Sequence, residues 1–311
     1  MNKQPMLLDC DTGVDDAVAI LLCKYLNNLE LVAATCVAGN VEVEKTTLNT
    51  LRVLELAGMT DIPVYAGAKE PLMGEQVIAS HIHGNNGLND MEIPLPKRRP
   101  EALPAWDAIY ECAKKYQGEL VIVAVGPLTN LALAIAKYKE LPKLVKRIVV
   151  MGGAATGGNI TPSAEFNVYA DPEAADMVFT CGAEVYMCGL DVTMASYFTP
   201  EELDELATLG SKQAVFARDV MQGILQFYRT HYLSGVAFHD PVTVLYADDD
   251  SYFQTDHVGI RVETKGKITR GKTVTDLYSD KQMEHNAYIV TKVDREVFKR
   301  RVFEIMAKYG A

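Results

Sequence analysis

The strongest constraint on the fold is a regular alternation between short apolar runs and longer segments with helical spacing. The apolar runs are rich in β-branched residues and end near Gly, Asn or Asp, as buried strands do. They cover residues 5–10, 31–38, 63–66, 120–125, 148–151 and 185–188. The segments with helical spacing cover residues 14–25, 43–56, 106–116, 131–138 and 172–179. This order predicts an α/β fold in which helices cover both faces of a parallel sheet.

The last third of the chain departs from this alternation. Two helical segments follow one another between residues 200 and 232, and residues 258–275 are expected to form a hairpin around Lys265-Gly266-Lys267. Residues 294–309 are expected to form an amphipathic helix. No linker rich in Pro, Gly or Ser and no internal repeat divides the chain, so we predict one domain over residues 1–311. The least regular stretch, residues 70–100, is long enough to be functional or disordered.

Composition and charge exclude several classes of protein. The 30 basic and 41 acidic residues leave a net charge of −11, which repels nucleic-acid backbones and anionic membranes. The six cysteines include no CxxC pair, a pattern typical of free thiols in a reducing compartment. Residues 1–5 lead into acidic sequence, unlike a signal peptide, and no apolar run approaches the roughly 20 residues of a membrane span. We therefore expect a cytoplasmic protein that binds neither nucleic acid nor membranes.

The most informative segment follows the first predicted strand and carries four carboxylates. Asp9 and Asp11 end the strand, Gly13 permits a tight turn, and Asp15 and Asp16 fall in the first turn of the next helix. A helix N-terminus favours Asp, so each residue alone has a structural explanation. Four carboxylates at the carboxyl edge of a sheet repel one another unless a cation joins them. Because no Cys or His lies among them, the cluster predicts a hard divalent cation, Ca²⁺ or Mg²⁺.

A Gly-rich segment, residues 152–158, follows the predicted strand at 148–151. It lacks the Lys and the spacing of a phosphate-binding loop. It leads instead to Asn159, Glu165 and Asn167, whose amides and carboxylate suit the hydroxyl groups of a ligand, although Asn and Gly also serve ordinary turns.

Two other groups have both a functional and a structural interpretation. His239-Asp240-Pro241 precedes an apolar run, and Asp240 there could be a helix N-cap with Pro at the first helical position. Residues 126–130 form a strand-to-helix turn whose carbonyls could face a metal at the sheet edge.

Together these segments resemble the nucleoside hydrolases of the inosine-uridine-preferring type. The motifs stand in the family's order and spread from residue 9 to residue 240. They are Asp9-Cys10-Asp11-Thr12-Gly13-Val14-Asp15-Asp16-Ala17, Val37-Ala38-Gly39-Asn40, Ile82-His83-Gly84, Gly126-Pro127-Leu128-Thr129-Asn130, Met151-Gly152-Gly153, Ala164-Glu165-Phe166-Asn167 and His239-Asp240. Thr12 stands where many members have Pro, a change that the turn tolerates.

The resemblance implies a single-domain α/β fold with an open, mostly parallel sheet on a Rossmann-like core. It also implies a tightly held Ca²⁺ and a homo-oligomer, either a dimer or a tetramer. The residues that match the family's metal ligands are Asp11, Asp16, Asp240 and, through its backbone carbonyl, Val125. The residues that match the ribose-binding set are Asp15, Asn40, Asn159, Glu165 and Asn167. His83 and His239 match residues placed toward the base, and a subgroup with His before the last Asp is thought to use it on the leaving group.

The chemistry of this family suits these roles. Hydrolysis of an N-ribosidic bond passes through a ribosyl cation, so an enzyme must stabilise positive charge, supply water and neutralise the departing base. Asp11 is expected as the general base toward a metal-held water, and the loss of the 2′-hydroxyl should make a substrate poor. His239, expected to have a pKa near neutral, would protonate the base while His83 holds it. Tyr228 and Tyr232, four residues apart on a predicted helix, could stack on the base or simply pack.

Two other functions compete with this interpretation. A Mg²⁺-dependent phosphatase of the haloacid-dehalogenase type also has Asp-x-Asp after its first strand. Gly13, however, stands where that family usually has Thr or Val, and no later Lys motif completes the set. A nucleoside-binding pseudo-enzyme should have lost the general base, whereas Asp11 and His239 are both present. The sequence leaves the preferred base and the oligomeric state open.

Overall fold

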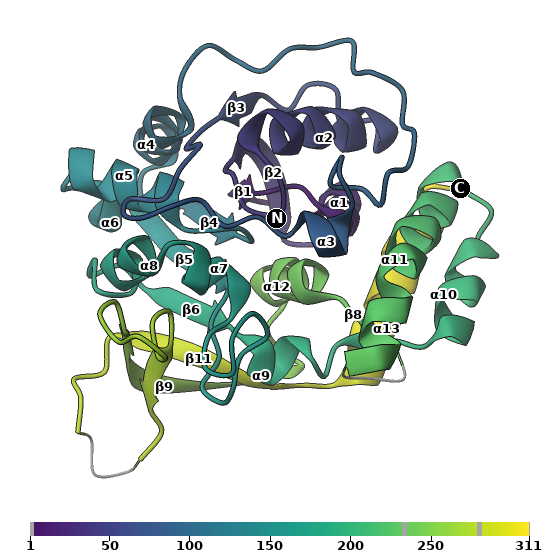
Figure 1. Ribbon diagram of the computed structural model, residues 1–311. Helices are drawn as coiled ribbons and strands as arrows, with labels where there is room; N and C mark the ends of the chain where they lie inside the picture. The colour runs from purple at the N-terminus through teal and green to yellow at the C-terminus, as the bar shows by residue number, and fades with distance from the viewer. Residues whose placement is uncertain (1–2, 232–234, 279–281, 311) are drawn as a thin grey trace.

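A nine-stranded sheet runs through the molecule in the order β10-β9-β11-β6-β5-β4-β1-β2-β3 (Figure 1). The computed structural model describes residues 3–231, 235–278 and 282–310, with the backbone alone at residues 226, 227, 230 and 231. The strands of this sheet are β1 (Gln4–Cys10), β2 (Leu29–Cys36), β3 (Val64–Ala66), β4 (Leu120–Ala124), β5 (Val145–Met151), β6 (Val185–Cys188), β9 (Phe253–Val262), β10 (Thr273–Asp276) and β11 (Ala287–Val293). A separate two-stranded sheet pairs β7 (Tyr197–Phe198) with β8 (Val236–Ala237).

The direction in which the strands are added changes between β1 and β4. From β1 the chain builds outward through β2 and β3, and it then returns to the other side of β1 and continues through β4, β5 and β6. All of these pairs are parallel, as is the pair of β11 with β6. In open α/β sheets, ligands bind outside the carboxyl ends of the strands at such a point of reversal. The turns after β1 and β4 are therefore the expected place for a site.

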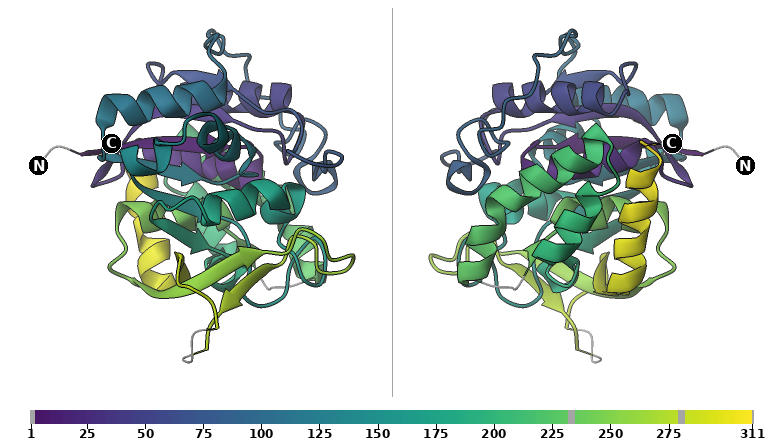
Figure 2. Two further views of the ribbon diagram at one scale, coloured as in Figure 1. Left: turned by 90° about the vertical axis from the view of Figure 1, so that its left-hand side faces the viewer. Right: turned by 90° about the vertical axis from the view of Figure 1, so that its right-hand side faces the viewer.

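Helices cover both faces of the sheet. On each face a separate apolar core lies between the sheet and its helices. The helices are α1 (Val14–Cys23), α2 (Val43–Leu56), α3 (Ser80–His83), α4 (Ala105–Tyr116), α5 (Thr129–Lys137), α6 (Leu141–Leu144), α7 (Phe166–Ala170), α8 (Pro172–Phe179), α9 (Leu190–Thr193), α10 (Pro200–Ala207), α11 (Lys212–His231), α12 (His239–Asp248) and α13 (Arg295–Ala307). One core lies beneath α1, α2, α11, α12 and α13, and the other beneath α4, α5 and α8. Figure 2 shows α10, α11 and α13 together on one side of the molecule.

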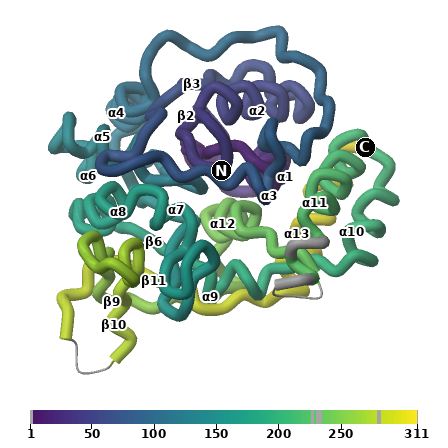
Figure 3. The backbone as a smooth tube through the Cα atoms, viewed as in Figure 1, coloured from purple at the N-terminus to yellow at the C-terminus, as the bar shows by residue number. Residues whose placement is uncertain are grey.

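Helix α12 packs directly on α1, although the two come from opposite ends of the sequence. The tube in Figure 3 makes this visible: the green α12 lies beside the purple start of the chain. This contact brings residues near 240 to the turn after β1.

The predicted strands and helices are largely confirmed. The six predicted strands are β1 to β6, the predicted helices are α1, α2, α4, α5, α8, α10, α11 and α13, and the hairpin is the antiparallel pair β9–β10. The sheet is mostly parallel, as the resemblance implied, and β9 pairs antiparallel with both β10 and β11. Two details differ from the prediction. Strand β11 was not predicted. The segment after His239 is a helix whose N-cap is Phe238, so Asp240 lies inside the first turn and is not the cap.

Two expectations about the chain as a whole can also be compared with the structure. All six cysteines carry free thiols, and four of them are buried. Among the helices in the described part of the chain, none has both the length and the apolar character that crossing a bilayer requires.

Candidate active site

The turn after β1 is held by the side chain of Asp16 in the first turn of α1. Its Oδ1 accepts the backbone N–H of Asp11 at 3.2 Å, and its Oδ2 accepts the N–H of Gly13 at 2.9 Å. The side-chain amide of Asn40, which follows β2, donates to the same Oδ2 at 3.0 Å. Asp16 thus accepts backbone N–H groups, as an Asp at a helix N-terminus ordinarily does. This structural role does not prevent Asp16 from also binding a cation.

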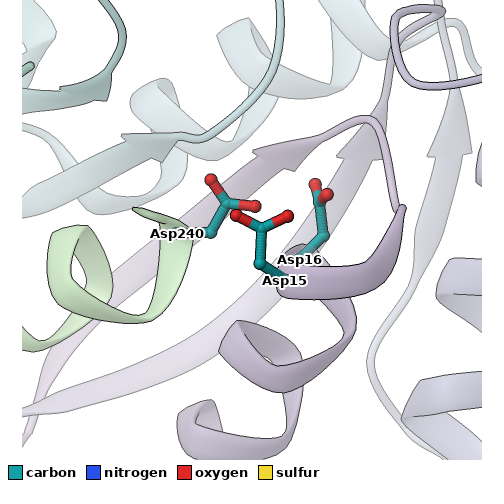
Figure 4. A group of neighbouring side chains, drawn as sticks. All are labelled: Asp15, Asp16 and Asp240. Atoms are coloured by element: carbon teal, nitrogen blue, oxygen red, sulfur yellow. The ribbon is translucent and has the colours of Figure 1, made fainter. Parts of the chain in front are cut away.

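Three carboxylates converge where α1 meets α12. Asp15, Asp16 and Asp240 are buried and each places an oxygen within 4.8 Å of the others (Figure 4). Burial, followed by repulsion from Asp16, raises the pKa of Asp15 to about 7. Burial and then repulsion from Asp15 also raise the pKa of Asp240 well above its usual value. A divalent cation among these oxygens would offset the repulsion and return the carboxyls to their ionised form.

Asp11 lies next to this group, although it is not part of the closest triplet. The backbone N–H of Asn40 donates to its Oδ2 at 2.7 Å, whereas its buried Oδ1 has no hydrogen-bond partner among the described residues. The backbone of two glycines packs closely against the carboxylate. A Cβ built on Gly39 would lie 2.2 Å from Oδ2, and one on Gly126 would lie 2.7 Å from Oδ1. Burial and repulsion from Asp16 raise the pKa of Asp11 well above its usual value.

These residues fit a hard cation. The candidate donors are the carboxylate oxygens and the carbonyl of Val125, a residue that directly follows β4 and lines the same pocket as Asp15 and Asp240. That carbonyl accepts the side-chain amide of Asn167 at 2.9 Å and retains a second lone pair. An orphaned buried carboxylate oxygen on Asp11 beside three crowded carboxylates is the pattern that an oxygen-bound divalent ion stabilises.

The predicted ribose-binding residues line one pocket. Four of them, Asn40, Asn159, Glu165 and Asn167, use part of the side chain to brace the site. Glu165 is the N-cap of α7 and accepts three backbone N–H groups, from Gly153, Asn167 and Val168, at 2.9 to 3.1 Å. The Oδ1 atom of Asn159 accepts the N–H of Phe166 at 2.9 Å. Asn167 donates with its Nδ2, and Asn40 does the same toward Asp16. The other polar atom of each amide is left for a ligand: Oδ1 in Asn40 and Asn167, and Nδ2 in Asn159.

The two histidines of the predicted set lie in the same pocket. Nδ1 of His83 accepts the N–H of Val14 at 3.1 Å, which assigns the ring proton to Nε2. His239 lies between two hydroxyls: its Nε2 is 2.6 Å from Oη of Tyr228, and its Nδ1 is 2.7 Å from Oγ1 of Thr193. Burial lowers the pKa of His83 to about 3 and that of His239 to about 4. The pKa of about 4 lies below the near-neutral value expected for His239, whose partly buried side chain lies between the two hydroxyls.

The pocket brings together most of the predicted residues and adds others. Asp15, Asn40, His83, Val125, Asn159, Glu165, Asn167, Tyr228, His239 and Asp240 line it. Asp11 and Asp16 are bonded to Asn40, which lines it. Tyr232 lies outside the described residues. Sequence reasoning assigned no role to His81 or to the apolar wall of the pocket, although two residues of this wall stand inside the motifs. The wall is formed by Ile82, Ile160, Phe166, Met194 and Ile224.

Among the wall residues outside the motifs, Ile224 left a usable signal. It precedes Tyr228 by four positions on α11, so helical spacing places both on one face. Thr193 ends the short helix α9, and nothing in the local sequence connects it with His239.

Comparison with known proteins identifies the family of this site. The family model of the inosine-uridine preferring nucleoside hydrolases matches residues 6–300. The pyrimidine-specific ribonucleoside hydrolase RihA of Shewanella woodyi is 39% identical over 297 residues, which are 95% of each chain. The protein of the same name from Citrobacter koseri is 38% identical over 309 residues, 99% of each chain.

Solved structures agree with the sequence comparison. The plant nucleoside hydrolase PpNRh1 has a TM-score of 0.93 at 33% identity, covering 98% of this chain and 99% of its own. The purine-preferring ribonucleoside hydrolase of Gardnerella vaginalis also has a TM-score of 0.93 at 33% identity, covering 99% of both chains. The chain belongs to the inosine-uridine preferring nucleoside hydrolase family, and it is an enzyme that hydrolyses ribonucleosides.

Proposed function

We propose that the enzyme cleaves the N-ribosidic bond of ribonucleosides to free base and ribose with the help of a bound Ca²⁺. The observation that carries this proposal is the buried carboxylate cluster at the strand-order reversal, opening into a pocket lined with side-chain amides. A cation held by these residues would act as a Lewis acid, lowering the pKa of a water and helping to bind the ribose diol. The proposed ligands are Asp11, Asp16, Asp240 and the Val125 carbonyl.

Asp11 is the proposed general base. Its Oδ2 is held by the N–H of Asn40, while its Oδ1 has no partner among the described residues and can accept a proton from water. The walls at Gly39 and Gly126 restrict the carboxylate to one position. A base fixed in this way loses little freedom when the reaction begins.

Ribose is the proposed ligand of Asp15, Asn40, Asn159, Glu165 and Asn167. The bracing hydrogen bonds of the three asparagines orient their remaining polar atoms before a substrate arrives. Hydroxyl groups that complete these contacts bind well, and a substrate without the 2′-hydroxyl leaves buried polar atoms unpaired.

The proposed proton donor to the departing base is the hydrogen-bonded pair Tyr228 and His239. Because burial lowers the pKa of His239 to about 4, its imidazole is neutral at pH 7. In the proposed step His239 first takes up a proton from solvent. As the Tyr228 hydroxyl gives its proton to the base, Nε2 of His239 passes its own proton to Oη, so that both residues end neutral. His83, with its proton on Nε2, is the proposed hydrogen-bond donor to the base.

The test is a kinetic panel of inosine, adenosine, uridine and cytidine, their 2′-deoxy counterparts, and p-nitrophenyl phosphate, followed by release of sugar or phosphate. We expect cleavage of ribonucleosides, poor cleavage of deoxynucleosides and no phosphate release. Phosphate release without nucleoside cleavage would favour a phosphatase, and nucleoside binding without cleavage would favour a pseudo-enzyme.

We propose a pyrimidine preference because the two RihA relatives, at 38 and 39% identity, are named pyrimidine-specific. A higher kcat/KM for inosine than for uridine would reject it.

We also propose a homo-oligomer, a dimer or a tetramer, in the cytoplasm. The edge strand β10 and the turn after it expose Val274, Leu277 and Tyr278, which supports an interface there. The free thiols support a reducing compartment. Light scattering of the purified protein tests the oligomeric state, and a mass of 34.2 kDa at all concentrations would mean a monomer.

A further inference from the structure

A buried polar pair lies beneath the carboxylate cluster and has no part in the reaction proposed above. Asp9, near the end of β1, and Asn130, in the first turn of α5, have no exposed surface. The Nδ2 atom of Asn130 donates to Oδ1 of Asp9 at 2.8 Å, and the Thr35 hydroxyl donates to the same oxygen at 2.6 Å. A buried carboxylate is costly to keep in a fold, so its place at the centre of the sheet calls for a function.

Asn130 ties together three segments at the carboxyl edge of the sheet. Besides Asp9, its Nδ2 donates to the carbonyl of Cys36 at the end of β2 at 3.0 Å. Its Oδ1 accepts the N–H of Ala68, beyond β3, at 2.9 Å. The amide fits closely, since a Cβ on Gly67 would lie 2.2 Å from its Oδ1. Both protons and the oxygen of this side chain are therefore used inside the protein.

These bonds hold both ends of the segment that carries the Val125 carbonyl. The N–H of Val125 donates to the carbonyl of Asp9 at 2.8 Å, and four residues later the turn enters α5 and reaches Asn130. Asp11 follows Asp9 by two residues, and its Oδ1 faces Gly126 in the same turn. Asp9 and Asn130 thus connect the backbone of one proposed metal ligand to the strand that presents another.

We propose that Asp9 and Asn130 are positioning residues that set the separation between the Val125 carbonyl and the Asp11 carboxylate, and thereby the affinity of the cation site. This inference rests on the proposed metal site. Partners that orient ligands in this way typically change metal affinity by about 10- to 100-fold when removed. The pair touches neither substrate nor cation.

The experiment measures Ca²⁺ binding to the chelator-stripped full chain by titration calorimetry, independently of turnover. Asn130→Ala is expected to weaken Ca²⁺ binding by about 10-fold or more. The matched control is Asn286→Ala, because the Asn286 side chain also bridges backbone groups, at Phe179 and Ile260, far from the site. It is expected to lower the melting temperature while leaving the Ca²⁺ Kd within about twofold of the wild type.

A charge swap provides the second test if Asn130→Ala does not fold. Asn130→Asp adds negative charge near the site, which by itself would tighten cation binding. The positioning role predicts weaker binding instead, because the bond to Asp9 is lost. Adding Asp9→Asn returns a donor and an acceptor to the pair and should restore part of the affinity.

Three outcomes would overturn the inference: wild-type affinity in Asn130→Ala, an equal loss in Asn286→Ala, or tighter binding in Asn130→Asp. If the wild-type chain binds no Ca²⁺ at all, the proposed metal site fails together with this inference. If the wild type binds and the Asn130 variants bind equally well, only the positioning role fails.

Discussion

The carboxylate of Asp11 has room for one position only, because backbone stands on both sides of it. Position 39 requires glycine because there is no space for a side chain. Its φ is not in the left-handed region, but a Cβ would lie 2.2 Å from Asp11 Oδ2 and 2.8 Å from Cδ of Pro127. Sequence reasoning included Gly39 in a motif without this reason. The contact explains why a residue outside the pocket can control the proposed base.

Gly39→Ala is therefore expected to displace Asp11 and to lower kcat by about 100-fold, with a loss of about 1–3 kcal/mol in the free energy of unfolding. The measurement is steady-state turnover of a ribonucleoside together with urea unfolding. Gly182→Ala is the control, since Gly182 has φ +86° in open space and its substitution should cost stability but no activity. Equal activity in both variants would refute the steric argument.

Asp11→Asn is expected to lower kcat by about 10²- to 10⁴-fold, the usual contribution of a general base. The amide oxygen can still accept the N–H of Asn40, so the turn should keep its shape. Turnover and Ca²⁺ binding are measured on the same preparation, with the exposed Asp250→Asn as the control. Near-normal turnover in Asp11→Asn would reject the assignment of the base.

The buried neutral imidazole of His83 predicts a pH-dependent stability. Burial lowers its pKa from 6.5 to about 3, so between these values the unfolded chain binds a proton that the folded chain does not. Stability must then fall as pH falls through 6.5. From pH 7 to pH 4 the wild type should lose about 2–3 kcal/mol relative to His83→Asn, whose amide oxygen can still accept the N–H of Val14. Urea unfolding in chelator measures this difference, and parallel pH profiles would contradict it.

At the scale of helices and strands, prediction succeeded where the hydrophobic pattern has a clear period. The apolar core of β1, the continuously apolar run of β4 and the amphipathic spacing of α2 give unambiguous signals. Helix α12 gives no such signal, because all residues from Asp240 to Asp248 are buried between α1 and the sheet. A helix that is buried on all sides shows no periodic apolar stripe in its sequence. The β-branched Val242, Thr243 and Val244 of α12 even favour a strand.

The far end of α12 is anchored by Asp248. Its carboxylate accepts the backbone N–H groups of Asn27, Asn28 and Leu29 at 2.7 to 3.1 Å, at the start of β2. Asp248→Ala leaves these groups without their acceptor and should cost about 2–4 kcal/mol. Thermal unfolding measures the loss, and Asp250→Ala at the exposed neighbouring position serves as the control. Because the anchor is at the opposite end of α12 from Asp240, kcat below the melting temperature should change little; a large fall in kcat at unchanged stability would contradict this.

At the scale of the whole molecule, the site exists only because distant segments meet at one edge of the sheet. The motifs from Asp11 to Asp240 identified the carboxylates, the amides and both histidines, and the fold brings them to the reversal between β1 and β4. Sequence reasoning could not find Thr193 or Met194, because their positions depend on how the short helix α9 packs and not on a local pattern. It also could not foresee the lowered pKa of His239, which results from burial.

The central claim is that a cation in the carboxylate cluster is needed for ribonucleoside hydrolysis. The most direct measurement follows ribose release by chelator-stripped protein, shown to be metal-free by elemental analysis, as CaCl₂ is added back. The account predicts that stripping abolishes turnover and that Ca²⁺ restores it along a saturable curve matching the calorimetric binding curve. Full turnover by the metal-free protein would contradict the account.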